Sequence, residues 1–166
     1  EIDALLPEAQ RPEHTEGYEG FYHLASISGS VEKAESYYII RDHDRAKFEQ
    51  KKDFARQVAD FMNLKYGEGT VTLTLKDQYY NMREMVEPHP ELIARAEEAM
   101  RKAGVVPAVK PIRGGTDGAR LSYMGLPCPN LFTGGMNFHG KYEYASLDTM
   151  KRALQTLINL AELWAR

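Results

Sequence analysis

The stretches IRGGTDG at residues 112–118 and NFHGKYE at residues 137–143 give the clearest indication of an α/β fold in this sequence. Each places a polar side chain, Arg113 or His139, in a loop that contains glycine. Between the two stretches the pattern predicts a short helix and an apolar strand. Because α/β proteins place their ligands at loops that follow strands, we expect these two loops to carry the chemistry.

The bulk composition is that of an ordinary soluble protein. The 166 residues are 43% hydrophobic and 27% charged, which suits one domain or two small ones. A net charge of −3 argues against a nucleic-acid or acidic-lipid partner. The single cysteine, Cys128, rules out an internal disulfide and fits the reducing cytoplasm. The sequence has no apolar run long enough for a membrane helix and no visible signal peptide, so we expect neither.

The first half of the chain predicts a β-β-α-β unit. Two strands, over 21–28 and 35–41, are close enough to form a hairpin, and Asp42 or Asp44 can cap the helix that follows. Apolar and polar residues then alternate from Val71 to Lys76, which predicts a half-buried strand. The helix is expected to bury one apolar face, made of Phe48, Phe54, Ala55, Val58, Phe61 and Met62.

The second half predicts an α-β-α-β-α pattern, as in part of an α/β layered domain. Prolines at 88 and 90 form a stiff break, so we place domains at 1–86 and 87–166. The elements expected after the break are a helix over 90–103, an edge strand over 105–112, a short helix ending at 124, a strand over 127–133 and a final helix capped by Ser146. The final helix has an apolar stripe of Leu147, Met150, Leu154, Leu157, Ile158, Ala161 and Trp164.

Arg113 and His139 are the candidate functional residues in the two glycine loops. Glycines let a substrate approach the backbone, and a planar guanidinium can bind a carboxylate through two hydrogen bonds. A tight turn with a surface arginine is the alternative for Arg113. His139 suits a metal ligand or a general base, with Glu143 able to orient its ring, although a single histidine is usually neither.

Other conspicuous residues favour structural roles. The run Asp42-His43-Asp44 is reminiscent of a metal motif, but capping of the next helix explains it better. Arg41 ends a strand, where it can pair with an acid or reach a ligand. Tyrosines at 79 and 80 could stack RNA bases, yet the negative net charge counts against nucleic acid and favours core packing.

The first seven residues resemble the last turns of an amphipathic helix stopped by a proline. Residue 1 is Glu, so we expect that the chain continues a longer polypeptide. A short helical arm at the N-terminus is the alternative.

Three further motifs show a resemblance to a known family. They are PEHTEGYEGFYHL at residues 12–24, YIIRD at 38–42 and YYNMRE at 79–84, and the glycine loops of residues 111–143 extend the match. From Arg11 onward the chain resembles the C-terminal part of the peptidase T family, the zinc-dependent tripeptide aminopeptidases of bacteria. The wider superfamily includes aminoacylase and succinyl-diaminopimelate desuccinylase.

The resemblance implies a two-domain fold. A zinc-peptidase domain would be interrupted by a ferredoxin-like lid, and this chain would begin within the first lid helix and lack the first lid strand. It would complete the lid near residue 84 and then re-enter the peptidase domain, in agreement with the break near residue 88.

The resemblance also assigns roles to individual residues. His139 matches the last zinc ligand, Arg113 the arginine of the substrate loop and Arg41 the lid arginine that faces the substrate. Asn81 and the backbone of Gly114 and Gly115 would lie near the substrate. The other ligands of the two zinc ions and the glutamate general base precede residue 1 in the family's order, so no catalytic residue is expected in this chain.

The resulting hypothesis is a fragment of a cytoplasmic zinc tripeptide aminopeptidase that is inactive by itself. Its partners would be the tripeptide, the missing N-terminal part of the catalytic domain and, through exposed apolar surface, a second copy in a homodimer or larger self-associate. Nucleic acid and membranes are not expected partners. The alternative is a free-standing ferredoxin-like binding or dimerisation module without catalysis.

Overall fold

The computed structural model describes residues 1–165, which form two compact units. The first unit contains Glu1–Asn81 and the short segment Pro111–Gly115. The second contains Met82–Lys110 and the chain from Thr116 onward. The segment 111–115 thus belongs to the first unit although both of its flanking segments belong to the second. The assignment of domains to 1–86 and 87–166 remains a prediction.

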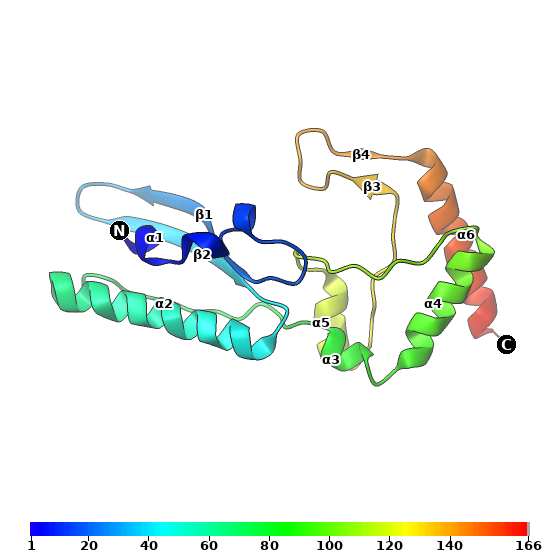
Figure 1. The fold of residues 1–166 in the computed structure, drawn as a ribbon, viewed down its shortest axis with the longest axis horizontal. Coiled ribbons are helices and arrows are strands. Elements are labelled where there is room, and N and C mark those ends of the chain that lie inside the picture. The colour runs from blue at the N-terminus through cyan, green and yellow to red at the C-terminus, as the bar shows by residue number, and fades with distance from the viewer. Residues whose placement is uncertain (166) are drawn as a thin grey trace. The chain divides into compact units, whose positions relative to one another are not determined.

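The first unit is built on an antiparallel hairpin (Figure 1). Its strands pair from Phe21 opposite Arg41 to Gly29 opposite Ala34, with a bulge between Leu24 and Ser26. The predicted hairpin is therefore confirmed. The elements of this unit are α1 (Ile2–Leu5), the 3-10 turns η1 (Glu8–Gln10) and η2 (Pro12–His14), β1 (Phe21–Gly29), β2 (Ala34–Arg41) and α2 (Arg45–Tyr66).

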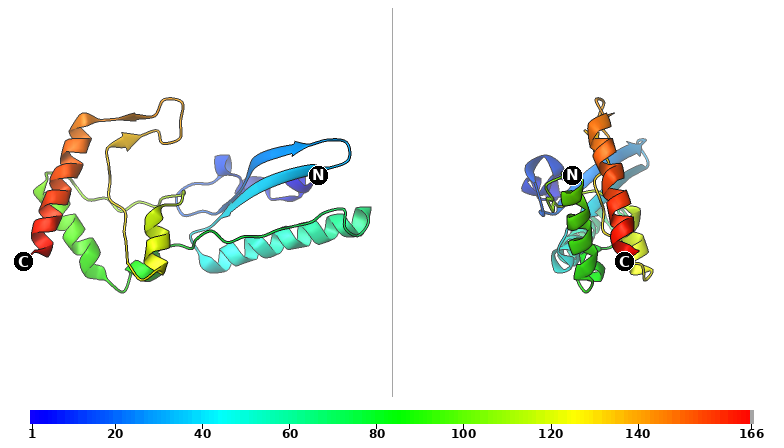
Figure 2. Two further views of the ribbon diagram at one scale, coloured as in Figure 1. Left: turned by 180° about the vertical axis from the view of Figure 1, so that it is seen from behind. Right: turned by 90° about the vertical axis from the view of Figure 1, so that its right-hand side faces the viewer.

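Helix α2 covers one face of the hairpin, as both Figure 1 and Figure 2 show. Asp44 is its N-cap, because the carboxylate accepts a hydrogen bond of 2.9 Å from the Lys47 amide. Gly67, with φ 109°, ends the helix in a conformation that favours glycine. Tyr22 and Val58 join Leu6 in a small buried core, to which Ile2, Leu5, Tyr38, Ile40 and Phe54 add partly buried side chains.

The predicted strand at residues 71–76 is wrong, because the described chain pairs this segment with no other strand. Its backbone bonds to a side chain instead. Asn63 of α2 donates to the Val71 carbonyl at 2.9 Å and accepts from the Val71 amide at 2.7 Å. Alternation gives a segment two different faces, but a strand also needs a neighbour with unsatisfied backbone groups. The full β-β-α-β arrangement is consequently not formed.

A buried lysine also holds this segment against α2. Lys52 is 7% exposed, and its ammonium lies 3.0 Å from Asp77 and 2.8 Å from Glu49. The hydrogen bond from Lys52, helped by one from Tyr80, lowers the pKa of Asp77 below its ordinary value. A carboxylate whose folded-state pKa is lowered stabilises the fold above its unfolded pKa and loses that contribution as the pH falls through the folded value.

Asp77→Asn is therefore expected to lower the free energy of unfolding by about 1 kcal/mol at pH 7, a figure discounted for the partial exposure of Asp77. The difference from wild type should begin to shrink below about pH 4, where the carboxyl becomes protonated in the unfolded chain, and should vanish only below the lowered pKa of the folded state. Urea unfolding gives the free energies of both proteins at pH 7 and at pH 3, where the difference should be smaller. Asp53→Asn, which breaks the exposed pair with Arg56, is the matched control. Equal effects of the two variants would contradict the prediction.

The second unit is mainly helical. Its elements are α3 (Arg83–Val86), α4 (Pro90–Lys102), α5 (Asp117–Tyr123), β3 (Gly135–Met136), β4 (Tyr144–Ala145) and α6 (Leu147–Trp164). Ser146 caps α6 as predicted, since its hydroxyl accepts from the Thr149 amide. Helices α4 and α6 lie side by side in both figures and share the hydrogen bond from Asn159 to the Ala99 carbonyl.

Two further strand predictions, over 105–112 and 127–133, are also wrong for the described residues. Both segments carry prolines, which lack the backbone donor, and their apolar residues find no neighbouring strand within residues 1–165. Val106 and Val109 are 88% and 76% exposed. Within residues 1–165, the sheet of this unit is limited to the two-residue antiparallel pair β3–β4, which the sequence did not predict. The mixed helix-and-sheet class is confirmed, and the α-β-α-β-α order is not.

The face that α6 buries also differs from the predicted stripe. Small or polar residues, Ala153, Thr156 and Asn159, are its buried positions. The large apolar residues remain exposed, with Leu154 at 60% and Leu157 at 53%. Close packing against α4 selects small side chains, whereas the stripe of large ones has no cover in the described chain.

Candidate functional site

Arg113 lies in the first unit, where its guanidinium is bound to the segment before β1. One terminal nitrogen donates to the carbonyl oxygens of Thr15 and, at 3.4 Å, of Pro12, and the other donates to the Thr15 hydroxyl. The guanidinium carbon lies 4.7 Å from the centroid of the Phe21 ring. The Nε atom is buried and has no hydrogen-bond partner in the part of the chain that the structure describes. The arginine is therefore neither a surface side chain nor freely mobile.

Gly115 packs directly against Tyr79. A Cβ atom at Gly115 would overlap the hydroxyl and the ring of Tyr79, so this position requires glycine. The Tyr79 hydroxyl is buried, and among the described residues it donates no hydrogen bond. Arg41, at the end of β2, places its guanidinium carbon 4.6 Å from the centroid of the same ring. Arg41, Tyr79 and Gly115 thus form one cluster.

Burial raises the pKa of Tyr79, and the nearby positive charge of Arg41 opposes part of that shift. The phenol consequently keeps its proton at neutral pH and can act as a hydrogen-bond donor. An unpaired buried donor is costly, which makes this hydroxyl a candidate to meet a ligand or a water molecule.

Asn81 and His43 link the loop of residues 111–115 to the start of α2. Asn81 donates to the His43 carbonyl at 3.0 Å. The two ring nitrogens of His43 lie 3.2 Å from the carbonyl oxygens of Tyr18 and Ile112. Together with the Asp44 cap, these contacts confirm that the Asp42-His43-Asp44 run serves local structure.

His139 lies in the second unit, in a loop with unusual backbone geometry. Both Asn137 and His139 have left-handed backbone angles, with φ of 56° and 64°. Such a conformation costs a non-glycine residue about 1–3 kcal/mol and is concentrated at functional sites. Glu143 accepts a hydrogen bond of 2.9 Å from the His139 backbone amide, so it positions the loop rather than the imidazole ring.

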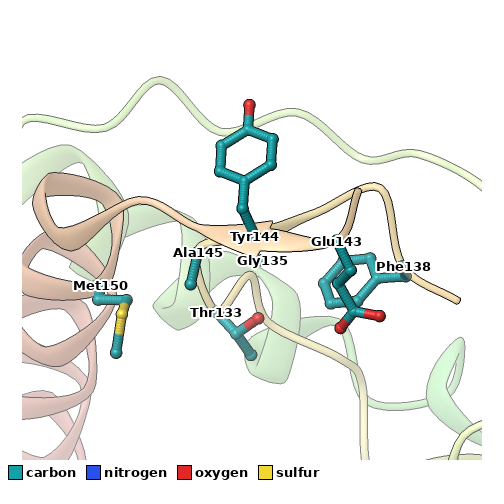
Figure 3. Close-up of a pocket in the computed structure, with 7 residues that line it drawn as sticks. All are labelled: Thr133, Gly135, Phe138, Glu143, Tyr144, Ala145 and Met150. Carbon is teal, nitrogen blue, oxygen red and sulfur yellow. The ribbon is translucent and has the colours of Figure 1, made fainter. Parts of the chain in front are cut away.

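A pocket with a volume of about 550 Å³ adjoins this loop (Figure 3). The Tyr144 ring points away from the side chains of Thr133 and Met150 in the lining. The residues that line the concavity are Thr133, Gly135, Phe138, Glu143, Tyr144, Ala145 and Met150. It is mostly apolar and offers one carboxylate, that of Glu143.

The described residues do not make a metal centre by themselves. Across residues 1–165, no group of three or more His, Cys, Asp or Glu side chains is placed to hold a metal ion. His139 is one donor, whereas a two-metal site needs several.

The structure gathers most of the predicted site residues in one unit. The first unit contains Arg41, Asn81, Arg113, Gly114 and Gly115. His139 belongs to the second unit. The sequence does not reveal Thr15 as the partner of Arg113. Thr15 lies within the motif at residues 12–24, but no local pattern connects two residues 98 positions apart.

Comparisons with known proteins agree on one family. Residues 8–163 match the family described as Peptidase family M20/M25/M40. The chain is 56% identical over all its 166 residues to a protein named Peptidase T from Caldanaerobacter subterraneus subsp. tengcongensis, and 54% identical over the same length to one from Alkaliphilus oremlandii. A Peptidase T from Parabacteroides distasonis is 57% identical. In each case the chain spans 41% of the relative's length.

Proposed function

Because this chain belongs to peptidase family M20/M25/M40, we propose that it forms part of a metallo-aminopeptidase that releases the N-terminal residue of tripeptides. The observation that carries the proposal is the identity of 54–57% to proteins named Peptidase T along the whole chain. Since the chain spans about two fifths of those relatives, the activity is proposed for a longer polypeptide that contains it, and the chain alone is expected to be inactive.

In this proposal the first unit contributes the substrate-binding side. Arg41 and Arg113 would hold the anionic end of the peptide or polarise its carbonyl, and Asn81 and the Gly114-Gly115 backbone would line its path. The close packing of Arg41, Tyr79 and Gly115 supports this assignment, because it keeps a cation and a protonated phenol beside a loop without side chains.

His139 is the proposed metal ligand. The family's chemistry calls for zinc, which supplies an activated water when it is bound. Since His139 is the single candidate ligand in the described chain, these residues do not fit a complete zinc centre, and no step of hydrolysis follows from them. The strained backbone at His139 and the hydrogen bond from its amide to Glu143 support a positioned ligand.

The chain alone is expected to bind zinc weakly, because one neutral imidazole cannot hold the ion. Isothermal titration calorimetry with zinc should give no tight one-to-one binding, and His139→Ala should change the isotherm little. His89→Ala, which removes an exposed histidine, serves as the control. Tight binding that His139→Ala abolishes and His89→Ala retains would contradict this expectation.

The function is tested on the polypeptide that contains this chain at the length of its relatives. With zinc, it should hydrolyse an unblocked tripeptide such as Ala-Ala-Ala and leave the N-acetylated tripeptide intact. His139→Ala should abolish hydrolysis, whereas His89→Ala should not. A polypeptide of that length with no tripeptidase activity in the presence of zinc would refute the proposal.

A second candidate is a non-catalytic binding or dimerisation module. The observation that favours it is the separate core of the first unit around Leu6, Tyr22 and Val58. For either candidate we propose the cytoplasm, on the basis of the single cysteine. Within residues 1–165, no helix is long and apolar enough to cross a membrane.

A further inference from the structure

We propose that Thr15 is a positioning residue for Arg113 and that it acts by holding the guanidinium fork against the start of the hairpin. This inference rests on the proposed function, in which Arg113 belongs to the substrate loop. In addition, the substrate would not meet a freely moving arginine. Both terminal nitrogens of Arg113 already have acceptors in the chain.

The contacts of Thr15 explain why this residue suits the task. Its hydroxyl donates to the Arg11 carbonyl at 2.9 Å, so its lone pairs face Arg113 and accept from the guanidinium. The Thr15 carbonyl accepts from the other terminal nitrogen. A threonine hydroxyl can donate once and accept twice, which lets this side chain join two segments at once.

The surroundings of Arg113 restrict the fork further. The Phe21 ring stacks near the guanidinium, and His43 contacts the carbonyl of Ile112, the residue directly before Arg113. Glycine follows at 114 and 115, so the backbone after Arg113 would be pliable without these contacts. Residues 111–115 belong to the first unit although their neighbours in sequence belong to the second, and these contacts account for that membership.

With the fork held, Nε is the guanidinium donor left without a partner among the described residues. We therefore infer that a bound peptide meets Arg113 as a fork whose position Thr15 has already fixed. Thr15 touches neither the peptide nor a reacting atom in this arrangement. It acts through the orientation that it imposes on Arg113.

The test uses ¹⁵N-labelled chain and the side-chain signals of its arginines. The Arg113 signals are identified by their loss in Arg113→Lys. In the wild type, slow rotation of the held fork should resolve the terminal N–H signals of Arg113. Thr15→Val removes the hydroxyl that accepts a hydrogen bond from the charged guanidinium. Rotation of the Arg113 guanidinium should therefore become about tenfold faster or more, and its terminal N–H signals should average. Thr15→Ser, which keeps the hydroxyl, should restore the wild-type spectrum.

Thr72→Val, which makes the same substitution at an exposed threonine of the first unit, is the matched control and should leave the Arg113 signals unchanged. If Thr15→Val does not fold, Arg113→Lys gives a second measurement, since loss of the fork should speed amide exchange at Gly114 and Gly115 about tenfold. Unchanged Arg113 signals in folded Thr15→Val, or unchanged exchange in Arg113→Lys, would overturn the proposal.

An activity measurement on the longer polypeptide separates this inference from the proposed function. Thr15→Val should raise KM for a tripeptide about tenfold while kcat changes little, and Thr15→Ser should return KM to the wild-type value. Failure of the longer polypeptide to cleave tripeptides would refute the proposed function without altering the spectroscopic result. An unchanged KM in an active Thr15→Val enzyme would overturn the role of Thr15.

Discussion

Gly115→Ala is expected to destabilise the first unit by about 1–3 kcal/mol, because the added methyl group would overlap the hydroxyl and ring of Tyr79. The overlap involves an aromatic ring that Arg41 covers on one face, so the neighbour has little room to move. The free energy of unfolding, measured by urea titration followed by circular dichroism, reports the change.

The neighbouring glycine provides a close control for this substitution. A Cβ at Gly114 would meet no atom within 4 Å, so Gly114→Ala should change stability by much less. Tyr79→Ala should remove most of the additional effect of Gly115→Ala, because it removes the atoms with which the methyl group collides. Equal effects of the two glycine substitutions would show that Gly115 does not pack against Tyr79 in solution.

The isolated chain is expected to self-associate through the exposed apolar face of α6. This face is formed by large apolar side chains that are each between 45% and 65% exposed, namely Leu147, Met150, Leu154, Leu157 and Ile158. An apolar stripe of this kind favours burial against another surface. Analytical ultracentrifugation should show a mass that rises with concentration, above the 18.9 kDa of one chain.

Leu154→Lys/Leu157→Lys is expected to shift this equilibrium strongly toward the monomer. Glu162→Lys is the charge-matched control, since it raises the net charge by the same two units at an exposed position of α6 without removing apolar area. A wild-type chain that stays monomeric at all concentrations would contradict the prediction. Equal effects of the two variants would place the contact elsewhere or make it electrostatic.

The sequence could predict elements whose stability is local. The hairpin of 21–41, the α2 cap at Asp44 and the α6 cap at Ser146 depend on neighbours a few residues away, and all three are present. Caps and hairpins need no distant partner, because a side chain and a backbone group close in sequence satisfy each other.

Strands at 71–76, 105–112 and 127–133 were predicted from the same kind of pattern and are absent in the described residues. A β-strand is stabilised by hydrogen bonds to another strand, which its own sequence does not contain. The α6 stripe is a similar case. Its period indicates a helix, which is present, but the pattern does not show that the small residues Ala153 and Thr156 are the buried ones.

For the candidate site, the sequence by itself determined the family, the residue types and the glycine loops, because motifs such as residues 111–118 are contiguous. Resemblance to a known family, which is visible without coordinates, also identified candidate site residues, namely Arg41, Asn81, Arg113 and His139. Their roles in binding substrate and metal remain predictions.

Tertiary structure alone decided which residues meet. Thr15 contacts Arg113 across 98 positions, Tyr79 limits Gly115 to glycine, and the segment 111–115 belongs with the hairpin rather than with its own neighbours in sequence. The physical reason is that hydrogen bonds and van der Waals contacts act over a few ångströms in space, whereas a sequence pattern reports only on neighbours along the chain.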